Sequence, residues 1–273
     1  GVEMSIGRIA TVAYHFSQRA RRQQELEGMG IEGSLSGKRV VISMDGGRLR
    51  VRKTKRGKKT KKGRSRYQTD WREPKLLVIY VVNETGRIDR EFAPVMDGTL
   101  QGPDEVFRLL EYYLSQLNIA EAAKILFIAD GAKWIWQRVA PLWQRLGLEG
   151  RCRELVDFYH VIEHVHALAA LKTSWQASER KRWATRQRRR LWRGEVDSFI
   201  EEIERFCRGK RGKGWDRERD YLLRNARAGR LNYAKARRAR LPMGSGTMES
   251  AIRRVVNLRL KGAGIFWREE HAE

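Results

Sequence analysis

Residues 38–47, KRVVISMDGG, are the stretch from which the fold can be worked out. Their Val and Ile run is typical of a short buried strand, which ends in Asp45 and is followed by two glycines. Residues 124–131, KILFIADG, repeat the pattern with a buried strand that ends in Asp130. A carboxylate at the C-terminal end of a strand lies at the sheet edge where ligands bind in α/β proteins. If the two strands are neighbours, both carboxylates converge on one site.

Around these two strands, patterns of strand and helix follow one another in mixed order. The turn sequence NETG between KLLVIYVV (75–82) and GRIDREFAP (86–94) predicts a hairpin. Hydrophobic periodicity then predicts a further series of elements: helix 103–117, a Trp-rich helix 133–143, strand 153–157 and helix 158–172. This order indicates an α/β fold with a mixed sheet flanked by helices, whereas residues 167–240 show only helical patterns.

The chain is strongly basic, with 57 Lys and Arg against 33 Asp and Glu in 273 residues, a formal charge of +24. Such an excess requires a polyanionic partner, of which nucleic acid is the most common. The chain is 41% hydrophobic, enough for a substantial core, and no apolar run approaches the roughly 18 residues of a membrane span. With only Cys152 and Cys207, neither a disulfide framework nor a cysteine zinc site is supported, and a reducing compartment fits.

The positive charge is concentrated in two clusters. Residues 50–66 contain eleven Lys and Arg and no acid, and we predict a mobile loop that contacts phosphates. Residues 179–193 place a second cluster on a helical pattern. The alternative is that both clusters are merely solvated surface. The side chains predicted to bind DNA are Arg50, Arg52, Lys53, Lys55, Arg56, Lys58, Lys59, Lys61, Lys62, Arg64 and Arg66 in the first cluster, and Arg188, Arg189 and Arg190 in the second.

A third acid, Glu249, is predicted in the first turn of the last helix, just after the glycines of GSG (244–246). Three carboxylates that converge would repel each other, and divalent cations relieve that repulsion. Two Mg²⁺ about 3.5–4 Å apart are the arrangement that promotes in-line displacement at phosphorus. Each acid taken singly has a structural alternative, because strand-end Asp is common and a first-turn Glu interacts favourably with the helix dipole.

Four blocks of the sequence resemble the motifs of ISKra-type bacterial insertion-sequence transposases of the DDE class. They are SMDGGRLRVR, FIADGAKWIW, VDFYHVIEHV and GSGTMESAIRRVVNLRLKGAGIFW, and the resemblance covers about residues 38–273 in the right order. It implies a ribonuclease H-like catalytic core with a helical insertion before its last helix. It also implies that Asp45, Asp130 and Glu249 are catalytic and hold two Mg²⁺, for which Mn²⁺ substitutes.

The resemblance also suggests roles for residues outside the three acids. Residues 157–160, DFYH, are similar to a Cys- or Asp-x-x-His motif of related DDE groups, which implies an accessory role for Asp157 and His160. Arg259 and Lys261 follow Glu249 in the last block and are expected to contact DNA. The implied partners are double-stranded DNA at the element ends and at the target, with a homodimer or higher oligomer on that DNA.

This comparison leads to an expected organisation in four parts. We expect a helical remnant of an N-terminal DNA-binding region at 1–37, the first part of the catalytic core at 38–166, a helical insertion at 167–240 and the last core helix at 241–273. The chain starts without a secretory pattern and stops inside a helical pattern, so we expect a piece of a longer protein. The expected location is the bacterial cytoplasm, in association with the nucleoid.

Three alternatives remain open from the sequence. One is a domesticated DNA-binding protein of the same fold that does not cut DNA, and another is a ribonuclease H-like nuclease. The third arises from HVIEH at 160–164, which matches the H-x-x-E-H pattern of zinc peptidases, in which His160 and His164 share one helix face. That reading explains neither the charge nor the two strand-end acids, and it lacks a distinguished third ligand among Glu195, Glu201 and Glu202.

Overall fold

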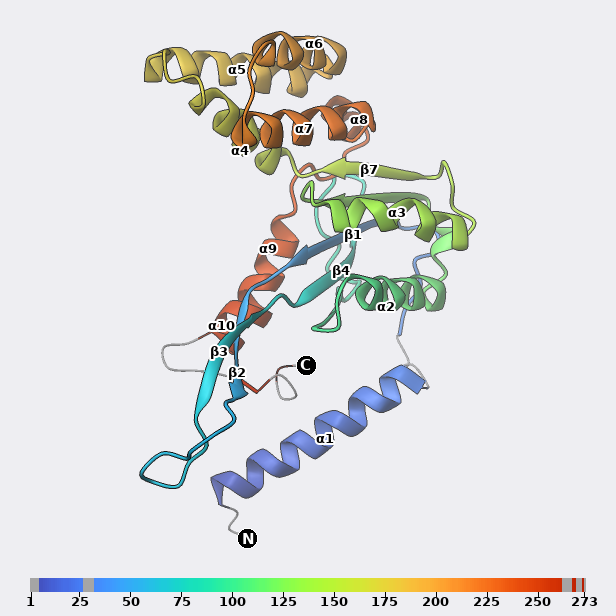
Figure 1. Ribbon diagram of the computed structural model, residues 1–273. Helices are drawn as coiled ribbons and strands as arrows, with labels where there is room; N and C mark the ends of the chain where they lie inside the picture. The colour runs from blue at the N-terminus through green and yellow to red at the C-terminus, as the bar shows by residue number, and fades with distance from the viewer. Residues whose placement is uncertain (1–4, 27–31, 262–266, 269–271, 273) are drawn as a thin grey trace.

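The computed structural model describes residues 5–26, 32–261, 267–268 and 272. A five-stranded sheet lies at the centre, with a bundle of helices beyond one end of it and a long two-stranded ribbon beyond the other (Figure 1). In the described part of the chain, none of the helices is long and apolar enough to cross a membrane.

The sheet is built around the stretch at 38–47. Its strands are β1 (Arg39–Gly46), β4 (Lys75–Val82), β5 (Val95–Thr99), β6 (Lys124–Ala129) and β7 (Cys152–Val156), in the order β5-β4-β1-β6-β7. β4 runs antiparallel to β1 and to β5, whereas β6 is parallel to β1 and to β7. The interior strands β1 and β4 are mostly apolar and are buried over most or all of their length, as a sheet covered on both faces requires. The fold is therefore ribonuclease H-like, and the predicted fold class is confirmed.

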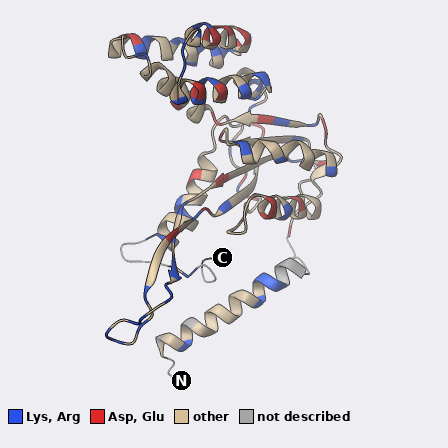
Figure 2. Cartoon of the chain, viewed as in Figure 1, with Lys and Arg blue, Asp and Glu red and all other residues tan. Residues whose placement is uncertain are grey.

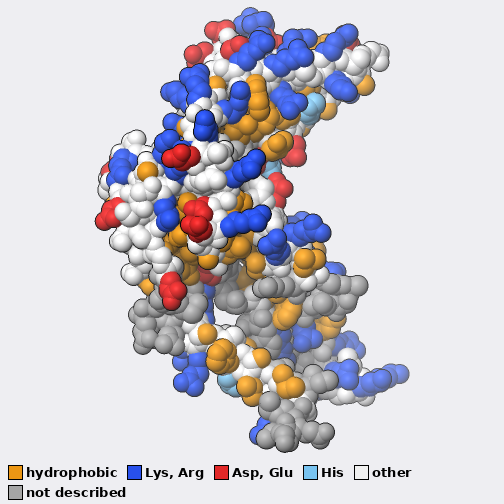
Figure 3. Space-filling model, turned by 180° about the vertical axis from the view of Figure 1, so that it is seen from behind, with side chains coloured by type: hydrophobic (Ala, Val, Ile, Leu, Met, Phe, Trp, Pro, Cys, Tyr) orange, Lys and Arg blue, Asp and Glu red, His pale blue; other side chains and the backbone are white. Residues whose placement is uncertain are grey.

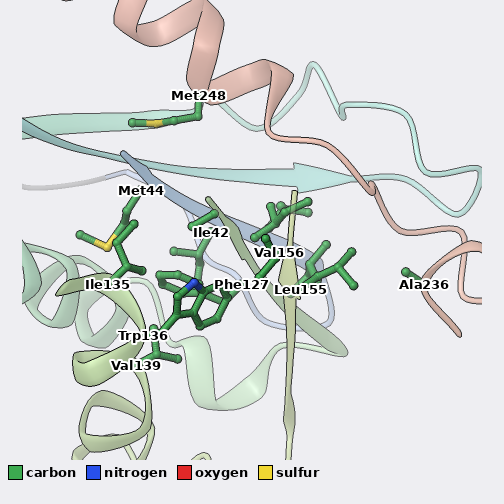
Figure 4. Packing of buried hydrophobic residues seen from close by; sticks show 14 of the residues in the cluster. Ile42, Met44, Phe127, Ile135, Trp136, Val139, Leu155, Val156, Ala236 and Met248 are labelled. Atoms are coloured by element: carbon green, nitrogen blue, oxygen red, sulfur yellow. The ribbon is translucent and has the colours of Figure 1, made fainter. Parts of the chain in front are cut away.

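Helices cover both faces of this sheet. On one face lie α2 (Pro103–Gln116) and α3 (Lys133–Arg145), whose Trp136 and Trp143 pack edge-on against Phe127 of β6 at 5.6 and 5.9 Å. On the other face lies α9 (Gly246–Ile252), which contacts β1 and β4. Figure 4 shows Met248 of α9 on the side of the strands opposite to Trp136. The position of α9 is therefore fixed by an apolar anchor one residue before Glu249.

Between β7 and α9 the chain is helical. Its helices are α4 (Phe158–Ala170), α5 (Ala177–Arg193), α6 (Val196–Cys207), α7 (Lys213–Arg227) and α8 (Tyr233–Arg238). Their shared core includes the buried Trp183 and Phe199. After α9, residues 253–257 form a π-helical turn that leads into α10 (Leu258–Leu260). The other two helical elements are α1 (Ile6–Leu26), whose Arg21 lies 3.3 Å from Asp97 of β5, and a single 3₁₀ turn at Ile119–Glu121.

The ribbon consists of β2 (Leu49–Thr54) and β3 (Tyr67–Arg72), paired antiparallel. It continues from the ends of β1 and β4, and Figure 2 shows that Lys and Arg gather toward its tip. The prediction of a loop across 50–66 is therefore only partly right, since residues 50–54 belong to a strand. The strand β3 was not predicted, because polar side chains on both faces conceal the alternation that marks a half-buried strand.

The predicted second strand of the hairpin, 86–94, is also wrong. The turn forms where NETG predicts it, with Asn83 N–H donating to Arg87 O at 2.8 Å. Beyond it only Ile88 bridges to Val82, and the strand that pairs with β4 is β5. The stretch 89–91 is charged, and Pro94 has no N–H to donate to a ladder, so this segment cannot form a sheet strand.

Candidate active site

Asp45 and Asp130 leave the sheet side by side. β1 and β6 are parallel, and Met44 of β1 is aligned with Ala129 of β6, so the next residue on each strand is an aspartate. Neighbouring strands are about 4.8 Å apart. Burial, followed by repulsion from Asp130, raises the pKa of Asp45 to about 6. Burial also raises the pKa of Asp130. Two carboxylates thus share a partly desolvated position at the C-terminal edge of the sheet.

A third strand end adds Asp157 beside them. β7 is parallel to β6 with Val156 aligned to Ala129, and Asp157 N–H donates to Ala129 O at 2.8 Å. Asp157 is fully buried and begins α4, where its side chain accepts the N–H groups of Tyr159 and His160. Residues 45, 130 and 157 therefore follow three neighbouring parallel strands, and the last was predicted as an accessory residue only from the DFYH motif.

The Asp157 carboxylate also holds the loop before α9. Its Oδ2 accepts the Ser245 N–H at 2.5 Å and the Ser245 hydroxyl at 2.6 Å. Burial acts to raise the pKa of Asp157, but its interactions with His160 and Ser245 outweigh burial and hold the pKa at about 2. The carboxylate is thus an anion whose oxygens are already engaged by protein donors, which makes it a structural centre for the residues around it.

His160 lies beside Asp157 and Glu249. Its Nδ1 is 3.7 Å from Asp157 Oδ1, an ion-pair distance rather than a hydrogen bond, and this carboxylate raises the pKa of His160 to about 9. Ligand atoms of Asp157, His160 and Glu249 all lie within 4.8 Å of one another. The positive charge of His160 also acts to lower the pKa of Asp45 and of Asp130. His160 is therefore linked to Asp157 and Glu249 by distance and to Asp45 and Asp130 by its charge.

The donor set fits a hard divalent cation. Carboxylate oxygens are the ligands that Mg²⁺ and Mn²⁺ prefer. Burial and then repulsion from Asp130 raise the pKa of Asp45, and a bound cation would favour its ionised form. Glu249 is exposed in the first turn of α9, so its carboxylate is accessible from solvent. In the described residues the group with metal-ligand geometry consists of Asp157, His160 and Glu249, whereas Asp45 and Asp130 are paired at the neighbouring strand ends.

Lys75, at the start of β4, was not anticipated from the sequence. It is aligned with Gly46 of β1 and is only 5% exposed. Its Nζ lies 2.6 Å from Glu73 Oε1 and 4.3 Å from the ring centroid of Trp134. Its charge acts to lower the pKa of both strand-end aspartates, but burial outweighs it at Asp130, and burial together with repulsion from Asp130 outweighs it at Asp45. The sequence does not indicate that this lysine lies near the acids, because only the register of the sheet brings them together.

The two glycines that follow the aspartates have different surroundings. A Cβ on Gly131 would overlap the ring of Tyr221 from α7, and Arg224 of that helix donates to Gly131 O at 3.0 Å. A Cβ on Gly46 would meet only the end of the Glu73 side chain. The helical segment between α4 and α9 therefore touches the backbone directly after Asp130, a contact that the sequence could not indicate.

The H-x-x-E-H pattern is present on α4, but its members have separate environments. His164 Nδ1 lies 2.5 Å from Glu218 Oε2 of α7, and its ring stacks on Tyr221 at 3.5 Å. Glu163 and His166 are exposed. In the described ranges, the three-residue group with metal-ligand geometry includes His160 but not His164. The second histidine of the pattern thus joins α4 to α7.

The glutamates considered as a third zinc ligand lie elsewhere in the helical bundle. Glu202 accepts the Trp183 Nε1–H at 2.9 Å and pairs with Arg205 at 3.2 Å. Glu195 is 3.9 Å from Arg193. Glu201 is exposed on α6.

The predicted DNA-binding side chains occupy three places. Residues 55–66 are exposed throughout and form the tip of the ribbon, and Arg188 and Arg189 are exposed on α5. Figure 3 shows Lys and Arg over the helical bundle and at the ribbon end. Arg190 instead donates to Gln187 at 2.8 Å and lies 3.6 Å from Glu202. Lys261 is exposed, whereas the Arg259 side chain lies outside the described residues.

Comparison with known proteins adds little to this geometry. No family model matches the chain, and no curated protein matches it significantly. A solved structure, a Drosophila P element transposase strand transfer complex, is similar with a TM-score of 0.30 and 11% identity, over 100% of this chain and 77% of that one. A likeness at this level carries no argument, so the functional conclusion depends on the arrangement of the chain's own residues.

Proposed function

We propose that the chain is the catalytic region of a metal-dependent DDE transposase. The observation that supports this most strongly is the pairing of Asp45 with Asp130 at the ends of parallel strands. Glu249 lies with Asp157 and His160, and the charge of His160 acts on both paired aspartates. In the proposed site Asp45, Asp130 and Glu249 hold two Mg²⁺, with Mn²⁺ as a substitute. The ions would activate a nucleophile and neutralise charge on the leaving oxygen.

The proposed reaction has two displacements at phosphorus. Water first attacks a phosphodiester at the end of the element and releases a 3′-hydroxyl. That hydroxyl then attacks a phosphodiester of target DNA, where a new bond forms as the target 3′-oxygen leaves. Both steps need positioning and charge neutralisation rather than a covalent enzyme intermediate, which suits a site made of carboxylates and metal.

Within this proposal Asp157 and His160 are positioning residues. The oxygens of Asp157 are occupied by four protein donors, so its role is to fix Ser245 and the start of α4. His160 then carries its positive charge to the acids at neutral pH, because its pKa is about 9. In the absence of metal, that charge offsets part of the repulsion among the carboxylates.

The basic tip of the ribbon and the exposed arginines of α5 would hold the DNA backbone. Affinity for DNA should therefore fall steeply as salt rises. We further propose that the active form is a dimer or higher oligomer on DNA in the bacterial cytoplasm, where the nucleoid supplies its target.

Cleavage of a labelled DNA duplex in Mg²⁺ or Mn²⁺ tests the assignment. Asp45→Asn should abolish cleavage while DNA binding persists, and Glu163→Gln on α4 is the matched control because Glu163 lies outside the cluster. Retained cleavage in Asp45→Asn would refute the site. If the parent chain cleaves DNA but gives no joined products, the nuclease is favoured. If the parent chain binds DNA without cleaving it, the DNA-binding protein is favoured. Metal-dependent hydrolysis of a peptide substrate that is lost in Glu163→Gln would instead favour the zinc peptidase pattern.

A further inference from the structure

The two faces of the β2–β3 ribbon differ in chemistry. Because side chains alternate along a strand and the pairing register is known, each face can be assigned. One face is anchored, since Leu49 and Val51 are buried and Asp70 lies 2.8 Å from Lys53 and 3.0 Å from Arg72. The opposite face, called here the outward face, carries Arg50, Arg52, Thr54, Tyr67, Thr69 and Trp71.

The outward face combines aromatic and cationic groups without an acid. Tyr67 and Trp71 are each 49% exposed, and Arg52 is also exposed. The guanidinium of Arg48 lies 4.7 Å from the Trp71 ring centroid and that of Arg50 lies 5.9 Å from it. Burial of exposed aromatic rings is favourable, and here it requires a partner that covers them. The surrounding positive charge favours an anionic partner.

The ribbon is fixed to the body at its base. Gly47 N–H donates to Pro74 O at 2.8 Å where the two strands leave the sheet. At the edge of β2 that faces away from β3, Arg52 N–H donates to Trp267 O at 2.8 Å, and Val51 bridges to Trp267. Since β1 ends with Asp45 and Gly46 and passes directly into β2, anything lying along the ribbon extends toward Asp45.

We propose that the outward face of the ribbon enters the major groove of duplex DNA and contacts bases there, while the basic tip at 55–66 holds the flanking phosphates. The major groove of B-DNA admits a two-stranded ribbon, and arginine and apolar side chains are groups that read base edges there. Six residues of strand span about 20 Å, so the ribbon reaches across the groove and along it. The proposal rests on the proposed function, which supplies duplex DNA as substrate.

A pair of adjacent cations gives a matched test, because Arg52 lies on the outward face and Lys53 on the anchored face of the same strand. Binding of a labelled B-form DNA duplex is measured by anisotropy in EDTA over a range of salt concentrations. Arg52→Ala and Trp71→Ala should each weaken binding by about tenfold, whereas Lys53→Ala stays within about twofold. Trp71→Ala should leave the salt slope unchanged, and Lys58→Ala with Lys59→Ala should reduce its magnitude by about 1.8.

An A-form RNA duplex of equal length separates groove contacts from charge, because its major groove is too narrow and deep for side chains. Trp71→Ala should not change binding to that RNA, and Trp71→Phe should restore most DNA binding. The proposal is overturned if Trp71→Ala binds DNA like the parent chain, if Lys53→Ala loses as much as Arg52→Ala, or if RNA binding falls equally with Trp71→Ala. Asp45→Asn distinguishes failure of the active-site assignment from failure of the ribbon proposal. If the active-site assignment is wrong, Asp45→Asn still cleaves DNA, and the binding results of the ribbon variants are unaffected.

Discussion

Asp157 and Ser245, 88 residues apart, are joined by two hydrogen bonds to a single carboxylate oxygen, one from the Ser245 N–H at 2.5 Å and one from its hydroxyl at 2.6 Å. Asp157 begins α4, which carries His160, and Ser245 precedes α9, which carries Glu249. The intervening helices therefore start and finish at the same point. This contact closes the helical segment beside the sheet, and α7 within that segment reaches the turn after Asp130 through Tyr221 and Arg224.

Asp157→Asn should destabilise the fold by about 2–4 kcal/mol, because it removes a buried anion from several donors. The pKa of Asp157 is lowered to about 2, so the stability it contributes is present above its unfolded pKa near 3.8 and is lost as pH falls through about 2. Urea unfolding of both chains at pH 7 and near pH 2.5 measures this difference. It should be large at pH 7 and shrink at the acidic pH.

Ser245→Ala is the partial control for that result, since it removes the hydroxyl donor but keeps the N–H. It should cost about 1 kcal/mol, less than Asp157→Asn. An equal cost at pH 7 and pH 2.5 for Asp157→Asn would show that the lost contribution is packing rather than the carboxylate charge.

Asp45→Asn should stabilise the metal-free protein at neutral pH. Burial and Asp130 raise the pKa of Asp45 to about 6, so its favourable contribution is complete below the unfolded pKa near 3.8 and is lost as pH rises through about 6. Above pH 7 the ionised carboxylate destabilises the fold by an amount on the order of 2 kcal/mol. Thermal unfolding of the parent chain and of Asp45→Asn in EDTA, at pH 5 and at pH 8, measures this difference in stability. A variant less stable than the parent chain at pH 8 would contradict the stated electrostatics.

Divalent cations should narrow the stability difference between the parent chain and Asp45→Asn. Mn²⁺ or Mg²⁺ at ten times its dissociation constant would add about 1.4 kcal/mol of stability to the parent chain, about 3–6 °C in Tm. Asp45→Asn, Asp130→Asn and Glu249→Gln should each lose most of that shift, and Glu163→Gln should keep it. Equal shifts in all five proteins would mean that the ions bind away from this cluster.

His160 should stabilise the fold in a pH-dependent way through Asp157. Its pKa is raised to about 9, so the contribution is complete below the unfolded pKa near 6.5 and disappears as pH rises through about 9. His160→Gln should therefore be less stable than the parent chain at pH 6 and match it more closely at pH 10. Urea unfolding at the two pH values, with His166→Gln as an exposed control from the same helix, measures the effect. A pH-independent difference would show that the ion pair contributes nothing.

The sheet could be predicted from the sequence because its strands carry their own signal. The apolar runs ending in Asp45 and Asp130 mark buried strands and place both acids at strand ends. β3 and β5 were missed because their side chains are mostly polar or half-buried and their positions depend on the partner strand. A strand at the sheet edge or in a ribbon needs no continuous apolar pattern.

Within the site, the three acids could be proposed from spacing and glycines, whereas the groups around them could not. Lys75 reaches the acids through the register of β4 on β1. Ser245 reaches Asp157 through the loop before α9. Tyr221 and Glu218 reach Gly131 and His164 through the packing of α7 on α4. These contacts join segments far apart in the chain, and a single sequence shows no pattern at such separations.

Gly131→Ala should damage the candidate site far more than Gly46→Ala, although both glycines follow a strand-end aspartate. At Gly131 the added methyl group would overlap the ring of Tyr221, which is stacked on His164 and has little room to move. At Gly46 it meets the carboxylate end of Glu73, which can rotate away. We expect a cost of about 1–3 kcal/mol at Gly131, with reduced metal-dependent stabilisation because the turn after Asp130 shifts, and less than about 1 kcal/mol at Gly46. Thermal unfolding with and without Mn²⁺ distinguishes the two. Tyr221→Ala combined with Gly131→Ala should recover part of the metal response, and the absence of recovery would show that Tyr221 is not what the methyl group displaces.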